Sequence, residues 1–275
     1  MNKKQHNRDD EQDVQHAAER VARQQAQQPE REQHKHKQQH VDPPARERAI
    51  VGPDAPQFSP SSRGRLTARD LGRFPGNTLF DRIGRALCDA GCLPRKELYE
   101  AWEVARRVRR LFRGGRVVDI GGGHGVLAQI LLLLDDTSPA ALVVDPKPVQ
   151  SAPAVQDAIE RAWPRIAGRI AFVTSPMERV AILPIDLVVS IHACGALTDR
   201  ILDRAVAARA RVAVVPCCHD LATCDAGDLG GWVDRPLAID IVRAQRLKAS
   251  GYRVWTQTIP LEITPKNRLL LGQPI

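Results

Sequence analysis

Short apolar runs alternate with amphipathic segments from residue 116 to the end of the chain. The apolar runs predict strands at 117–120, 141–145, 170–173, 186–191, 211–215, 252–259 and 268–272. Helical spacing between them predicts helices at 126–134, 154–163, 198–207 and 237–250. This alternation is typical of a parallel α/β sheet. The last two strands have a short connection, so we expect them to close the sheet as an antiparallel pair.

Two helices are predicted before this alternating region. Apolar residues at helical spacing indicate a short helix within 79–88, and Pro94 begins a stronger one with arginines opposite its apolar stripe. We expect this pair to pack beside the sheet. Residues 1–62 are polar and contain almost no bulky apolar side chains, so they are predicted to be a disordered tail. The predicted organisation is therefore a tail at 1–62, a basic helical extension at 63–115 and an α/β domain at 116–275.

A glycine-rich turn follows the first strand and is the most informative motif in the chain. Asp119 ends the strand, and Gly121, Gly123 and Gly125 alternate after it. Such a turn lets the backbone approach a ligand closely, and the N–H groups of the next helix face that ligand. Asp145 ends the second strand about twenty residues later, where an acid binds ribose hydroxyls. The pair of motifs predicts a nucleoside-type cofactor.

The acid before the glycines distinguishes among such cofactors. Asp119 would repel a pyrophosphate, so a nicotinamide oxidoreductase is disfavoured, and it would attract a positively charged amino-acid tail. The arrangement resembles motif I of the Rossmann-like S-adenosylmethionine methyltransferases. That resemblance implies a seven-stranded methyltransferase sheet and S-adenosylmethionine as cofactor. It implies that Asp119 binds the methionine amino group and Asp145 the ribose, with Gly121 and Gly123 under the cofactor, and Glu178 is a candidate for the adenine side.

Histidines and cysteines gather after the predicted fourth and fifth strands. His192 and Cys194 follow one strand, Cys217, Cys218 and His219 follow the other, and Cys224 lies a little further on. Three interpretations are open: a zinc site, a substrate pocket, or simple packing. The chain lacks paired Cys-x-x-Cys elements, and we expect the adjacent Cys217 and Cys218 to point in different directions. We therefore favour the substrate pocket, with His192, Cys194 and His219 as catalytic candidates, and assign no metal ligand.

These two segments also carry a narrower resemblance. The sequences His-Ala-Cys-Gly-Ala-Leu-Thr-Asp at 192–199 and Pro-Cys-Cys-His at 216–219 look like one methyltransferase domain family. That family includes the eukaryotic tRNA 2′-O-methyltransferase that acts on the acceptor stem. The chain has no counterpart of that enzyme's separate zinc-knuckle segments, and it lacks the Asn-Pro-Pro-Tyr type tetrapeptide of amino-group methyltransferases.

Charge points to a substrate class. The net charge is +8, and its excess lies within residues 63–116, which hold fourteen Lys or Arg against six Asp or Glu. Six arginines at 106–116 form a basic segment that is either an RNA phosphate footprint or a solvated helix face. We expect a methyltransferase acting on RNA. The alternatives are a non-catalytic RNA-binding module and a methyltransferase of proteins or small molecules. The polar N-terminus and the absence of long apolar stretches predict a cytoplasmic protein without membrane contact.

Overall fold

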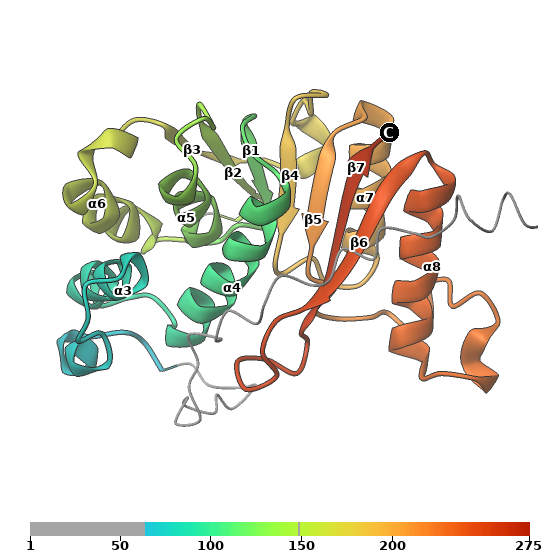
Figure 1. Cartoon of the computed structure of the whole chain (residues 1–275), viewed down its shortest axis with the longest axis horizontal. Helices are drawn as coiled ribbons and strands as arrows, with labels where there is room; N and C mark the ends of the chain where they lie inside the picture. The colour runs from blue at the N-terminus through green and yellow to red at the C-terminus, as the bar shows by residue number, and fades with distance from the viewer. Residues whose placement is uncertain (1–63, 148) are drawn as a thin grey trace, which may run out of the picture. The chain divides into compact units, whose positions relative to one another are not determined.

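A seven-stranded sheet lies at the centre of the computed structural model, which describes residues 64–147 and 149–275 (Figure 1). Its strands are β1 (Val117–Ile120), β2 (Ala141–Asp145), β3 (Ile170–Thr174), β4 (Leu187–Ser190), β5 (Arg211–Val214), β6 (Tyr252–Thr258) and β7 (Arg268–Pro274). The strand order is β3-β2-β1-β4-β5-β7-β6, and β7 runs antiparallel to both of its neighbours. The predicted Rossmann-like sheet, including its closing antiparallel pair, is confirmed.

Six α-helices of the described residues cover this sheet. They are α3 (Leu79–Ala90), α4 (Arg95–Leu111), α5 (Val126–Leu134), α6 (Ala152–Ala162), α7 (Ala196–Ala208) and α8 (Arg235–Ala249). The chain moves outward from β1 through α5 to β2, and in the opposite direction from β4 through α7 to β5. Because both crossovers are right-handed, α5 and α7 lie on opposite faces of the sheet (Figure 1). Helix α4 packs on α5, and α3 packs on α6.

The helix ends follow from their capping residues. Thr78 accepts a hydrogen bond from the Asp81 N–H at the start of α3 (3.1 Å), and Gly91 ends that helix with a φ of +69°. Asp234 accepts a bond from the Leu237 N–H at the start of α8 (2.9 Å). No helix among the described residues is long and apolar enough to cross a membrane.

Helix α4 corrects one expectation about the basic segment. The sequence pattern placed its arginines opposite the apolar stripe, yet Arg109 is only 3% exposed. Its guanidinium donates to the Leu131 carbonyl (3.0 Å) and the Ser138 hydroxyl (2.8 Å), and it lies 3.1 Å from an Asp135 carboxylate oxygen. Arg109 therefore anchors α4 to the end of α5. Periodicity missed this because the partners lie more than twenty residues away in sequence.

Residues 215–234, between β5 and α8, are irregular apart from turns and the short 3-10 helix η4 (Leu229–Gly231). The Gly- and Cys-bearing stretch at 216–236 predicts such an irregular connection, and the structure confirms it up to residue 234, because α8 already begins at Arg235. The expectation of a disordered tail at 1–62 lies outside the described residues.

Candidate functional site

The glycine turn leaves open space at two of its three predicted glycines. Gly121 and Gly123 have φ values of +66° and +53°, and nothing lies within 4 Å of where a Cβ would stand. Gly125 differs, because a Cβ there would come 2.8 Å from the Phe172 ring. The first two glycines thus border a space that a ligand can enter, while Gly125 serves the packing of α5 against β3.

Asp119 presents a buried carboxylate to this turn, and no cation of the described residues pairs with it. Its side chain is 2% exposed, and Oδ2 has no hydrogen-bond partner among the described residues. Burial raises the pKa of Asp119 to about 8; a hydrogen bond from the Ala128 N–H opposes the shift, and the charges of Glu97 and Asp145 add to it. An isolated buried carboxylate is costly unless a positive group pairs with it. The site is therefore suited to a ligand that carries a cation.

Asp145 lies in a cavity next to the turn. The cavity has a volume of about 340 Å³, and its walls include Gly123, Val143, Pro153 and Phe172. One oxygen of Asp145 accepts the Lys147 N–H at 2.9 Å, which fixes the carboxylate in place. The structure thus brings together Asp119, Gly121, Gly123 and Asp145, as the spacing of the two motifs predicted.

Three side chains that the sequence analysis did not select close the turn from the side. His124 Nδ1 lies 3.0 Å from a carboxylate oxygen of Glu97 on α4, and its Nε2 lies 3.0 Å from the Ser151 hydroxyl beside α6. Glu97 also lines a small recess with Asp119 and His192. Helix α4 therefore reaches the cofactor end of the sheet through Glu97. The sequence did contain a signal for Glu97: it is three residues before Glu100, so two acidic side chains share one face of the predicted helix.

The candidate catalytic residues after β4 separate from one another in the structure. His192 is half exposed, and its Nε2 lies 3.9 Å from a carboxylate oxygen of the buried Glu100. Because it also lines the recess with Asp119, His192 is the candidate that borders the glycine turn. Cys194 instead faces Cys217, with 3.3 Å between the two sulfurs.

Cys217 and Cys218 correct the expectation that neighbouring cysteines point apart. The sulfurs of Cys194, Cys217 and Cys218 all lie within 4.8 Å of one another. Side-chain alternation applies only within a strand, and β5 ends at Val214. Burial raises the pKa values of the Cys194 and Cys217 thiols. We call these three residues the thiol cluster.

His219 belongs to a second group, centred on Arg243 of α8. Arg243 is 1% exposed, and it bonds to Asp199 (2.6 Å) and Asp240 (3.2 Å). His219 Nε2 lies 2.9 Å from the same Asp240, and the Cys224 thiol donates to Asp199 at 3.6 Å. We call this group the arginine network. Its members are held by one another, and the side chain of His219 is 2% exposed.

Glu178 lies apart from the other predicted cofactor residues. It belongs to the short 3-10 helix η3 (Met177–Arg179) after β3 and forms an ion pair with Arg200 of α7. It is not among the residues that line the cavity beside Asp145.

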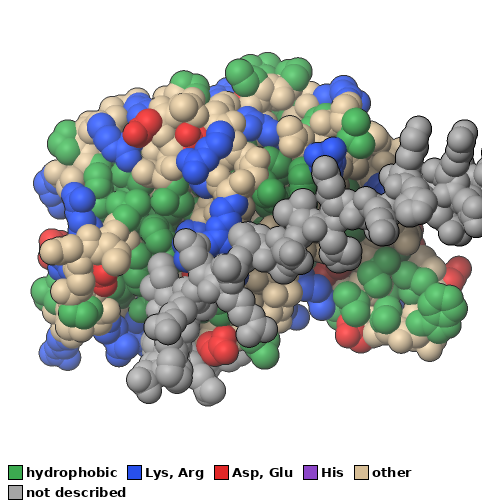
Figure 2. Space-filling view, in the orientation of Figure 1, with side chains coloured by type: hydrophobic (Ala, Val, Ile, Leu, Met, Phe, Trp, Pro, Cys, Tyr) green, Lys and Arg blue, Asp and Glu red, His purple; other side chains and the backbone are tan. Residues whose placement is uncertain are grey.

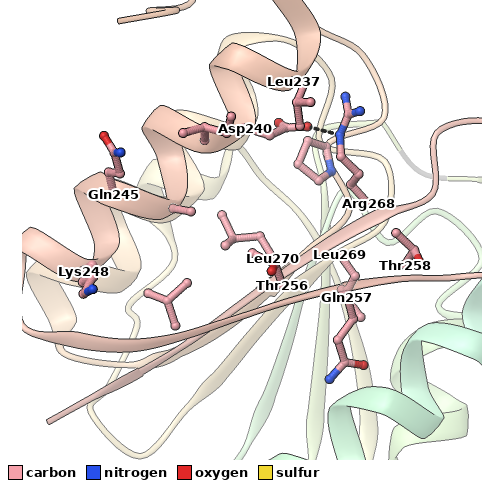
Figure 3. A pocket seen from close by; sticks show the side chains of 14 residues that line it. Leu237, Asp240, Gln245, Lys248, Thr256, Gln257, Thr258, Arg268, Leu269 and Leu270 are labelled. Atoms are coloured by element: carbon pink, nitrogen blue, oxygen red, sulfur yellow. Dashed lines mark hydrogen bonds and ion pairs between the residues drawn. The ribbon is translucent and has the colours of Figure 1, made fainter. Parts of the chain in front are cut away.

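A larger cavity of about 650 Å³ lies between α8 and the strands β6 and β7. Figure 3 shows Leu237, Leu269 and Leu270 along it, with the Asp240–Arg268 ion pair near Leu237. The Arg268 Nε donates to Asp240 at 2.6 Å, so this end of the cavity adjoins the arginine network. Its lining does not include the glycine turn or Asp145.

The basic segment at 106–116 is largely engaged within the protein. Arg113 donates to the Leu134 carbonyl (2.9 Å), and Arg116 pairs with Asp186 (2.6 Å). Asp186 and Arg116 directly precede β4 and β1, so these contacts lie at the amino ends of the strands, opposite the glycine turn. Figure 2 shows basic side chains distributed over the visible face with hydrophobic areas between them.

Comparison with known proteins shows what this domain is similar to. Residues 96–224 match a protein-family model described as "Methyltransferase domain". The match includes the glycine turn, Asp145 and the loops after β4 and β5. This part of the chain is therefore similar to methyltransferase domains, which agrees with the seven-stranded Rossmann-like sheet, and S-adenosylmethionine is the cofactor that such domains use. A search of curated proteins found no match to the chain.

Several solved structures have a similar arrangement of strands and helices at low sequence identity. An O-methyltransferase family protein from Burkholderia thailandensis is 16% identical, over 78% of this chain and 65% of that one, with a TM-score of 0.44. The ribosomal protein L11 methylase from Lactobacillus delbrueckii is 14% identical, over 64% and 76%, with a TM-score of 0.41. CalO1 of calicheamicin biosynthesis, solved with S-adenosylhomocysteine, is 22% identical, over 65% and 55%, with a TM-score of 0.42. The chain spans less than two thirds of the first and third of these proteins, and resemblances this distant carry no information on its substrate.

Proposed function

We propose that this protein transfers a methyl group from S-adenosylmethionine to a nucleophile on RNA. The observation that carries the cofactor part is Asp119, a buried carboxylate that pairs with no cation in the described part of the chain and lies beside a glycine turn that borders open space. The methyltransferase family match supports the same conclusion. The choice of RNA as substrate rests on the excess of positive charge within residues 63–116.

The side chains around the glycine turn fit S-adenosylmethionine, and this fit does not depend on the family match. The α-amino group of its methionine part is a cation and would satisfy the unpaired oxygen of Asp119. Asp145 lies across the turn in a cavity with mainly apolar walls, where a ribose can be held by its hydroxyls and a base by the apolar surface. Glu97 and His124 close the side of the turn through their hydrogen bond.

Residues near the glycine turn would then position the substrate and take its proton. The cofactor supplies an electrophilic methyl group on a sulfonium sulfur. A substrate nucleophile that took this methyl group would have to lose its proton to a base. We assign that role to His192, because it is half exposed and borders the recess with Asp119. The buried His219, bonded to Asp240, is assigned a positioning role instead.

The arginines of the basic segment divide by their position. Arg109, Arg113 and Arg116 bond at the amino ends of the strands. We assign the RNA contacts to two other arginines of α4: Arg110, which is exposed, and Arg106, which is half-buried and pairs with Glu103 on the same helix. A double Arg106→Gln, Arg110→Gln variant should bind RNA more weakly, and its salt dependence should flatten by about 0.7–0.9 for each phosphate that it no longer neutralises. Lys248→Gln, at an exposed position on α8, is the matched control.

Two measurements test the proposal. Titration calorimetry of the full chain should show S-adenosylmethionine binding, and Asp145→Ala should weaken it by roughly 1.5–3 kcal/mol. Binding of NADH without S-adenosylmethionine binding would overturn the cofactor assignment. For the substrate, modified nucleosides in RNA from wild-type and gene-deleted cells are compared by mass spectrometry. A methylated nucleoside that is missing from the deleted strain supports an RNA substrate. The RNA substrate would be contradicted if the RNA is unchanged and if, in cell extracts supplied with methyl-labelled cofactor, the label appears in proteins or small molecules instead.

A further inference from the structure

The thiol cluster joins the ends of two neighbouring strands. Cys194 follows β4, and Cys217 and Cys218 follow β5. Their three sulfurs lie within 4.8 Å of one another, and Cys194 and Cys218 are exposed. The cluster is therefore both compact and reachable from solvent.

The backbone holds this arrangement from both sides. The Gly195 N–H donates to the Cys218 carbonyl at 2.9 Å, which ties the two loops together. Gly195 has a φ of +57° and a ψ of −132°, a conformation that residues with a Cβ rarely adopt. Arg243 donates to the Gly195 carbonyl at 3.1 Å, so the arginine network anchors the same turn. The closeness of the three thiols thus follows from fixed loops.

The chemistry of the donors selects a soft cation. Tetrahedral zinc has bonds of about 2.3 Å to thiolate sulfur, which places such sulfurs about 3.8 Å apart. The observed 3.3 Å between the Cys194 and Cys217 sulfurs lies near that spacing and is far longer than a disulfide bond of about 2.05 Å. His219 and Cys224 bond within the arginine network, so the cluster offers three ligands. Three thiolates favour zinc or a similar soft ion over magnesium or calcium.

We propose that Cys194, Cys217 and Cys218 bind one soft divalent cation of the zinc class, with a fourth position open to water. Zinc sites with three protein ligands commonly keep such an open position. The proposal does not depend on methyl transfer, because it concerns metal binding alone. It extends the sequence interpretation, which assigned no metal ligand after expecting Cys217 and Cys218 to point apart.

Cobalt binding to the full-length protein tests the site. The chain is stripped of metal with a chelator, kept reduced and titrated with Co²⁺ alone, since thiolate-to-cobalt charge-transfer absorption reports sulfur ligands. This readout matters because the tail contains five histidines that can also take up metal. We expect the absorption to saturate at one cobalt per chain and to disappear when Zn²⁺ is added.

Single substitutions locate the ligands. Cys194→Ser, Cys217→Ser and Cys218→Ser should each weaken thiolate-dependent binding by more than about 100-fold, since even outer-shell partners cost about 10–100-fold. The matched control is Cys224→Ser in the same loop, whose thiol bonds to Asp199, and it should keep the signal. Melting of the metal-free variants checks folding. If Cys217→Ser does not fold, the two exposed positions carry the test.

Three results would overturn the proposal. One is the absence of the charge-transfer absorption in the reduced wild-type protein. Another is an equal loss of binding in Cys224→Ser and in the cluster variants. The third is a Cys194–Cys217 disulfide, found by peptide mass spectrometry after air oxidation, in a protein that binds no cobalt when reduced, which would make the cluster a redox pair.

Discussion

Asp119 and Asp199 are two carboxylates near the same edge of the sheet with opposite electrostatic surroundings. Asp119 has an oxygen with no hydrogen-bond partner among the described residues, and burial raises its pKa to about 8. Asp199 is also partly buried, but the hydrogen bonds and charge of Arg243 outweigh burial and hold its pKa below the ordinary value. The protein supplies the counter-ion for one carboxylate and leaves the other for a ligand.

This contrast separates structural from binding residues without reference to sequence motifs. Arg243 satisfies Asp199 and Asp240, and it also holds the Gly195 carbonyl, so the arginine network fixes the loops after β4 and β5. Asp119 instead carries an energetic cost in the ligand-free protein, because its charged form is desolvated. A site that costs stability when empty is typical of binding and catalytic positions.

The largest effect is expected from removing the counter-ion of the paired carboxylates. Arg243→Met should destabilise the protein by about 3–5 kcal/mol, because it leaves Asp199 and Asp240 without a buried cation. Urea denaturation measures this loss. Arg246→Met is the control: Arg246 also pairs with Asp199 but is 45% exposed, so its loss should cost less than about 1 kcal/mol. Equal effects of the two substitutions would show that Arg243 does not hold the loops.

The unpaired carboxylate should respond in the opposite way. Asp119→Asn keeps the shape of the side chain and removes its charge, so cofactor binding should weaken by about 1.5–3 kcal/mol. The melting temperature of the ligand-free protein should stay the same or rise, because a desolvated acid has been removed. Calorimetry and thermal melting provide the two readings. A lower melting temperature with unchanged affinity would make Asp119 a structural residue like Asp199.

The raised pKa of Asp119 predicts how cofactor affinity depends on pH. An acid whose folded pKa is raised favours its protonated form, so it costs stability as pH rises from about 4, the unfolded value, to about 8. Binding of a cation requires the charged form, so affinity should rise by up to about tenfold per pH unit between about pH 6 and pH 7.5. Titrations in buffers of different ionisation enthalpy should show a proton released on binding. Asp119→Asn should abolish both effects, and a wild-type affinity that is flat over this range would contradict the raised pKa.

The sequence identified the unpaired carboxylate but not the paired one. Asp119 and Asp145 stand at fixed spacings from a glycine turn in the sequence, so local spacing was enough to predict that both lie beside it. The same holds for the strands and helices, since their periods repeat within a few residues. Arg243 and Asp199 are 44 residues apart, and nothing in the spacing of either indicates the other.

Contacts between residues distant in sequence explain the remaining differences. Cys217 and Cys218 lie beyond the end of β5, where side chains no longer alternate, so their convergence with Cys194 could not be inferred from the strand pattern. Arg109 shares a helix with the exposed Arg110, and its burial depends on Asp135 at the end of α5. In each case the decisive partner is distant in sequence.

The smallest effect is expected at Glu178, an exposed carboxylate that already has a counter-ion. Its side chain is 44% exposed and pairs with Arg200, and it does not line the cavity beside Asp145. Glu178→Gln should therefore change stability by less than about 1 kcal/mol, the usual range for an exposed ion pair. Cofactor affinity should stay within about twofold of wild type, because that factor corresponds to only about 0.4 kcal/mol. Calorimetry measures the cofactor affinity of this variant, and Asp145→Ala, measured in the same way, shows the loss expected when a residue that contacts the cofactor is removed. A tenfold loss in Glu178→Gln would mean that Glu178 leaves Arg200 and reaches the cofactor, as its position after β3 first indicated.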